Sequence, residues 1–197
     1  MQAMCHYDAP VAGAVFRDGV HASGARLHAG SCVRFGIEFE IAVRLGRDLP
    51  AGGAAVTLAE VQGAVDAVAP AIEIVDDRGC DYATLDVFSL VADNAWNAGI
   101  VLGEFRAEWP ELADVVGQVF VDDDTSVRHE GRGRDALGHP LLAVTWLANH
   151  LATQGEQLRA GDVVMTGSIV TTKFPVAPCR YRFAVSGLGA VELTLLA

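Results

Sequence analysis

The chain has 197 residues, of which 51% are hydrophobic and 20% charged, and its formal net charge is −11. This length and apolar content are enough to bury a core, which argues against disorder, and the negative charge argues against binding to nucleic acid or to an anionic membrane. No apolar run reaches the roughly 18 residues of a spanning helix, and the first residues lack a signal-peptide pattern. We therefore expect one cytoplasmic domain over residues 1–197, with four reduced cysteines that lack C-x-x-C spacing.

The first third of the chain predicts loops followed by one long strand. Residues 1–35 contain short apolar bursts between glycines, which favours loops and short strands. EFEIAVRLG, at 38–46, then alternates with a period of two, so Glu38 and Glu40 point to one face and Phe39 and Ile41 to the other.

The next stretch predicts a helix and a second strand. Thr57 followed by Glu60 is typical of a capping box, and it predicts a helix over residues 57–69 that Pro70 ends. AIEIV, at 71–75, then predicts a strand that carries Glu73.

The remaining elements predict a β-rich α+β domain. A looser stretch from residue 76 leads to an apolar segment that returns as a strand before Gly103. We then expect a hairpin over 114–128, an amphipathic helix over 139–155 that Gly155 stops, a turn and a buried strand over 158–170, and a closing hairpin over 181–196.

Three glutamates interrupt these apolar strands. An ionised carboxylate in a low-dielectric site is costly unless it is paired, protonated or bound to a metal. Glu38, Glu40 and Glu73 would together supply hard oxygen ligands for Mg²⁺ or Mn²⁺ and leave positions for water and substrate. The alternative is that they lie on the solvated face of an antiparallel sheet, where alternating Glu is ordinary.

Other polar residues have both functional and structural interpretations. Thr166, Gly167 and Ser168 follow a buried strand, where their N–H and hydroxyl groups could receive a carboxylate or simply form a turn. Asp93, in an apolar context, is a further candidate for substrate binding, although an Asx turn is the alternative. We interpret Arg78 as a structural partner of Asp76 or Asp77. The same reasoning makes His139 a capping or packing residue.

Several segments, in order, resemble the fumarylacetoacetate hydrolase superfamily, and within it the branch of 2-keto-4-pentenoate hydratases and 4-oxalocrotonate decarboxylases. The resemblance rests on IEFEIAVRLGRDLP, PAIEIVDDR, ADNAWNAGIVLG, GHPLLAVTWLANHLATQGEQLRAGDVVMTGS and the final GLGAVEL. It extends over nearly the whole chain.

The resemblance implies a mixed β-sandwich or β-roll of the fumarylacetoacetate hydrolase C-terminal-domain type, with flanking helices. It also implies that Glu38, Glu40 and Glu73 bind Mg²⁺ or Mn²⁺ and that the turn at 166–168 holds the carboxylate of a 2-keto acid. The implied activity is that of a lyase on 2-hydroxydienoate or 2-keto acids through an enolate that the metal stabilises. A hydratase is favoured, and a decarboxylase or a C–C hydrolase is the alternative.

The resemblance also directs attention to one lysine. Members of this branch carry a lysine in a G-x-K-x-G context near the N-terminus, and MQAMCHYDAP resembles the stretch that follows it. We expect a shortened gene product or a substitute for that lysine. Lys173 is the only lysine of the chain, and Asp8 resembles an acidic position near the substrate. A catalytically inactive paralogue that only binds or assembles is the competing interpretation. Under either interpretation we expect a homo-oligomer.

Overall fold

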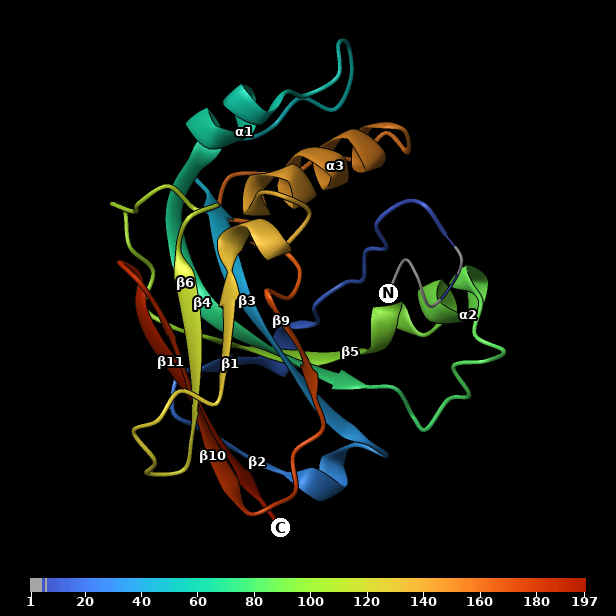
Figure 1. Cartoon of the computed structure of the whole chain (residues 1–197). Helices are drawn as coiled ribbons and strands as arrows, with labels where there is room; N and C mark the ends of the chain where they lie inside the picture. The colour runs from blue at the N-terminus through green and yellow to red at the C-terminus, as the bar shows by residue number, and fades with distance from the viewer. Residues whose placement is uncertain (1–4, 6) are drawn as a thin grey trace.

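The computed structural model describes residue 5 and residues 7–197, and it contains two mixed sheets packed face to face (Figure 1). The larger sheet has six strands, in the order β1 (Val20–Ala22), β5 (Asn97–Leu102), β4 (Val65–Asp76), β3 (Phe35–Leu45) and β8 (Val163–Met165), with β9 (Val170–Lys173) also paired to β3. The smaller sheet has five strands, in the order β2 (Ala25–His28), β11 (Gly189–Leu196), β10 (Cys179–Val185), β6 (Val116–Val121) and β7 (His129–Arg132). Both sheets are mixed because β1 is parallel to β5 and β2 is parallel to β11. This β-rich α+β fold confirms the predicted class.

Short helices lie at the edges of the sheets. The α-helices are α1 (Leu58–Ala64), α2 (Val87–Ala92) and α3 (Pro140–Ala152), and the 3₁₀ turns are η1 (Arg17–Gly19), η2 (Ala29–Ser31), η3 (Asn94–Trp96) and η4 (Gly133–Asp135). No helix within the described residues is long and apolar enough to cross a membrane.

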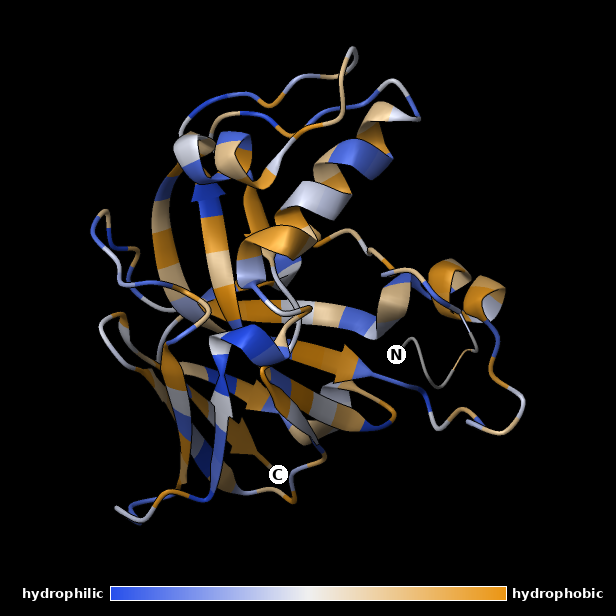
Figure 2. Cartoon of the chain, turned by 45° about the horizontal axis from the view of Figure 1, so that its top comes forward, coloured by the Kyte–Doolittle hydropathy of each residue, from blue (hydrophilic) through white to orange (hydrophobic). Residues whose placement is uncertain are grey.

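The main core lies between the two sheets. Phe39 of β3 contacts Phe183 and Tyr181 of β10, with ring centroids 5.3 and 5.9 Å apart. Figure 2 shows hydrophobic residues along the strands of both sheets, interrupted by hydrophilic ones in several strands. The face of β3 that carries Phe39 and Ile41 therefore packs against the smaller sheet, and the other face, which carries Glu38 and Glu40, points away from it.

The predicted helix over 57–69 is too long. The capping box of Thr57 and Glu60 is present, but α1 ends at Ala64 and β4 begins at Val65. Residues of β4 are buried on both faces, which favours a central strand between β3 and β5 over an amphipathic helix.

Pro70 lies inside β4 and does not end an element. Its carbonyl accepts a hydrogen bond from the N–H of Gly103, 2.9 Å away, on the side of β5. A residue of an antiparallel strand directs its N–H and its C=O to the same neighbour. The hydrogen bond that Pro70 cannot donate would therefore go toward the end of β5. This position lies beyond the last pair of the ladder, Ala71 with Leu102, so the lack of an N–H costs little there.

The other predicted elements are present, with three differences. The closing hairpin of β10 and β11 and helix α3 are confirmed, and His139 caps α3 by accepting the N–H of Leu141. A hairpin of β6 and β7 is present, but β7 begins at His129, beyond the predicted end of the hairpin at residue 128. Helix α2 was not predicted. The guanidinium of Arg78 pairs with Asp93, whereas Asp77 pairs with Arg34, and Arg78 bonds Asp76 only through its backbone N–H over 3.0 Å.

Candidate metal centre

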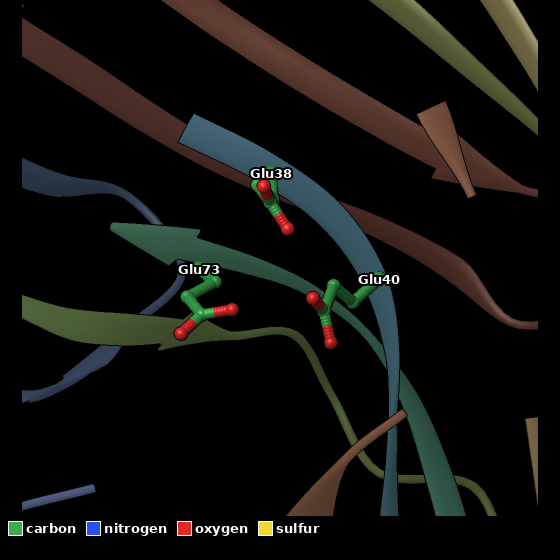
Figure 3. Close-up of side chains that lie close together, drawn as sticks. All are labelled: Glu38, Glu40 and Glu73. Atoms are coloured by element: carbon green, nitrogen blue, oxygen red, sulfur yellow. The ribbon is translucent and has the colours of Figure 1, made fainter. Parts of the chain in front are cut away.

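Three carboxylates from β3 and β4 converge on one face of the larger sheet. Glu38 and Glu73 are directly opposite each other across the two strands, and Glu40 follows two positions along β3. Figure 3 shows the three side chains pointing toward one another. One oxygen from each lies within 4.8 Å of the others, so the predicted constellation is brought together.

A different neighbour orients each carboxylate. The N–H of Gly167 donates to Glu40 over 2.8 Å, and the side-chain amide of Asn97 donates to Glu73 over 2.7 Å. The hydroxyl of Thr172 donates to Glu38. Because these three donors are neutral, they fix the carboxylates without cancelling their charge.

Burial makes this arrangement costly. Glu40 is only 1% exposed, which excludes the solvated-face alternative for this residue. Burial, together with the charges of Glu73 and Glu38, raises the pKa of Glu40 well above its usual range. Burial also raises the pKa of Glu73 to about 7, opposed by the amide of Asn97 and reinforced by Glu38.

The donor set fits a divalent cation. Like charges directly opposite on neighbouring strands are destabilising, yet no ion pair within the described residues includes Glu38, Glu40 or Glu73. Carboxylate oxygens are the ligands that Mg²⁺ and Mn²⁺ prefer, and three of them leave positions of an octahedron for water and substrate. These residues could therefore hold one such ion.

A cavity of about 650 Å³ opens beside the carboxylates, with Glu40 and Glu73 in its wall. Its other walls come from the segment Pro10–Val15, from α3 and from the stretch 161–168 that includes β8. A small molecule in this cavity would contact the carboxylates and an apolar surface together.

The turn after β8 lines the same cavity. Thr166, Gly167 and Ser168 are all in its wall. Both hydroxyls are used within the protein: that of Thr166 donates to the carbonyl of Ile41 over 2.8 Å, and that of Ser168 to the carbonyl of Val170 over 2.6 Å. The N–H of Gly167 is also used, since it donates to Glu40. The role of this turn in holding a substrate carboxylate stays a prediction.

The remaining candidates are not brought to the carboxylates. Lys173 is opposite Ile37 in the ladder of β3 and β9, so it shares the face of Ile37 and lies near His129, while Thr172 points to Glu38. Asp93 pairs with Arg78, and Asp8 is exposed. The site roles of these three residues stay predictions.

Sequence reasoning missed Asn97 and the turn that positions it. Asn94, Ala95 and Trp96 all have positive φ, between 52° and 65°, which is unusual for consecutive residues that are not glycine. The side chain of Asn94 bonds both the N–H and the C=O of Ala14 and so ties the N-terminal segment to this turn. The only signal in the sequence was a polar DNAWN run in apolar surroundings.

Comparison with known proteins identifies relatives over most of the chain. The sequence profile described as "Fumarylacetoacetate (FAA) hydrolase C-terminal" matches residues 6–195. A 2-keto-4-pentenoate hydratase of Burkholderia vietnamiensis is 35% identical over 95% of this chain and 70% of its own length. A 4-oxalocrotonate decarboxylase of Pseudomonas putida is 37% identical over 79% of this chain and 58% of its own length.

A solved structure shares the fold. The 4-oxalocrotonate decarboxylase from Pseudomonas putida G7, complexed with magnesium and adipate, superposes with a TM-score of 0.89 at 30% identity. The match covers 99% of this chain and 73% of that one.

Proposed function

The chain belongs to the fumarylacetoacetate hydrolase family, and we propose that it is a divalent-metal-dependent lyase of 2-keto acids, specifically a hydro-lyase of the 2-keto-4-pentenoate hydratase type. Relatives of this chain are hydratases and decarboxylases, and the magnesium in one related structure supports the choice of Mg²⁺ or Mn²⁺ as cofactor.

The observation that carries the proposal is the carboxylate cluster. Glu38, Glu40 and Glu73 are held among mostly apolar neighbours in the pair of β3 and β4, with neutral hydrogen-bond partners and beside a cavity. A protein that used this sheet only for packing would gain stability from apolar residues at these positions. The cost of burial is therefore explained by ligand binding.

Each residue has a defined task in this proposal. Glu38, Glu40 and Glu73 would hold the ion, while Thr172, Gly167 and Asn97 fix the directions of their oxygens. When bound, a divalent cation supplies Lewis-acid chemistry, which polarises a keto oxygen and stabilises negative charge on it. The apolar residues of the cavity would contact the part of the substrate that lies away from the ion.

A decarboxylase is the second candidate. The related structure with a TM-score of 0.89 is a 4-oxalocrotonate decarboxylase, and the two activities would use the same metal ligands in this proposal. C–C hydrolysis and a chain that binds without turnover are the further alternatives.

A metal titration tests the proposal first. We expect Mn²⁺ to bind to the purified chain in a titration measured by EPR or calorimetry. We also expect it to bind more tightly in the presence of oxalate, which mimics a pyruvate enolate. Glu40→Gln should lose this binding. Tight Mn²⁺ binding that is unchanged in Glu40→Gln would refute the ligand assignment.

Turnover assays then separate the activities. The hydratase assignment predicts that 2-hydroxypenta-2,4-dienoate is consumed with loss of its dienol absorbance, whereas a decarboxylase would release CO₂ from 4-oxalocrotonate. Metal binding without either reaction would favour the non-catalytic alternative.

The association of chains stays a prediction. Phe88 and Val91 of α2 are 81% and 54% exposed, and Figure 2 shows α2 as a hydrophobic helix at the edge of the molecule. Light scattering after size exclusion would test whether the chain forms a homo-oligomer.

A further inference from the structure

The charges around the cavity are all of one sign. Its charged lining residues are Glu40, Glu73, Asp135 and Asp162, and no arginine, lysine or histidine of the described part of the chain lines it. Asp135 and Asp162 each accept a backbone N–H over 2.7 Å. An ion bound by the glutamates would offset their own negative charge, and not that of Asp135 and Asp162.

Most of the other lining residues are apolar, apart from Asn97, Thr166 and Ser168. Ala143, Trp146 and Leu147 follow the spacing i, i+3, i+4 and so form one face of α3 toward the cavity. Ile100 and Leu102 of β5 line it as well.

Part of this apolar lining is open to solvent. Three lining residues are among the exposed large hydrophobic side chains of the described chain, namely Val20, Leu137 and Val163. Apolar side chains that are exposed inside a cavity gain free energy when an apolar ligand group covers them.

We propose that this cavity selects 2-keto acids with an uncharged, apolar tail and rejects those with a second carboxylate, and that the α3 face of Ala143, Trp146 and Leu147 contacts the tail. The inference rests on the proposed function, because it takes the keto-acid end to lie at the glutamates. A distal carboxylate would lose its hydration without gaining a cation, whereas an alkyl tail would bury apolar area.

A matched ligand pair tests this selectivity. 2-Oxohexanoate and 2-oxoadipate have the same carbon chain, and they differ by a terminal methyl in place of a terminal carboxylate. Binding to the Mn²⁺-loaded protein is measured by calorimetry, and by fluorescence because Trp146 lines the cavity. We expect 2-oxohexanoate to bind at least about tenfold more tightly, since an unpaired carboxylate is costly to desolvate.

Oxalate in the same experiment separates the two possible failures. If oxalate binds but 2-oxoadipate binds as tightly as 2-oxohexanoate, the inference about the tail is wrong and the proposed function stands. If neither oxalate nor the keto acids bind with metal, the proposed function fails and the inference fails with it.

A pair of variants tests the position of the tail. Ala143→Arg places a cation on the α3 face, and Ala143→Gln adds a side chain of comparable length without charge. We expect the arginine variant to reduce the preference for 2-oxohexanoate about tenfold through pairing with the distal carboxylate, and the glutamine variant to keep it. Equal preferences in the two folded variants, checked by circular dichroism and oxalate binding, would show that the tail lies elsewhere.

Discussion

The two sheets of this protein accommodate polar residues differently. In the smaller sheet, β10 and β11 alternate between buried and more exposed residues, so charged side chains such as Glu192 face water. In the larger sheet, β3 and β4 are buried on both faces, by the smaller sheet on one side and by the cavity walls on the other. A glutamate is therefore ordinary in β11 but costly in β3, and only the second position indicates a site.

Matched glutamine substitutions in the two sheets test this contrast, and they have the largest expected effect. Glu40→Gln should weaken Mn²⁺ binding by more than about 100-fold, because it removes a charged ligand. Glu192→Gln should leave binding unchanged, since it removes only exposed ion pairs with Arg180 and Arg182. Calorimetric titration measures both, and equal losses would contradict the assignment of the site to the larger sheet.

A core substitution separates packing from metal binding. Phe183 is fully buried and contacts Phe39 from the smaller sheet. Phe183→Ala should lower the free energy of unfolding by about 3–5 kcal/mol through loss of burial and a residual cavity. Urea unfolding measures this loss. Metal affinity of the folded variant should change much less than in Glu40→Gln, and a comparable loss would show that the two sheets do not act independently.

Asn97 should have an intermediate effect. Asn97→Leu keeps the size of the side chain but removes the hydrogen bond to Glu73, and loss of a partner that orients a ligand weakens metal binding about 10- to 100-fold. Because this bond lowers the pKa of Glu73, the variant should also shift the midpoint of metal binding to higher pH. Reduced affinity with an unchanged pH midpoint would indicate a purely structural role.

The buried carboxylates predict that rising pH lowers the stability of the metal-free protein but increases the stabilisation by bound metal. The pKa of Glu73 is raised to about 7 and that of Glu40 is raised too, so the metal-free folded state keeps protons that the unfolded state releases. From about pH 4.5 to pH 7, the free energy of unfolding should therefore fall as pH rises. Mg²⁺ binds the ionised form, so its stabilising effect should grow over the same range. Thermal unfolding in EDTA or Mg²⁺ measures both trends.

The sequence predicted the parts of the site that depend on local geometry. A strand period of two places Glu38 and Glu40 on one face, and this required no tertiary information. The end of α1 could not be predicted in the same way, because the apolar run from Val65 fits either a helix or a strand until its neighbours are known. The contact of Asn97 with Glu73 depends on the register of β5, and the α3 wall depends on packing between distant elements.

Substitution of Lys173 has the smallest expected effect, and it tests whether this residue replaces the lysine of the related proteins. If it replaces the lysine that the resemblance places near the substrate, Lys173→Met should weaken binding of a 2-keto acid. Its position opposite Ile37, on the face of β9 away from Glu38, favours a change of less than about threefold, because charges on opposite faces of a sheet do not share a ligand. Competition with oxalate measures the affinity, and Thr172→Val, which removes the partner of Glu38 on the other face, is the control that should reduce it. A larger loss in Lys173→Met than in Thr172→Val would show that the lysine reaches the site after all.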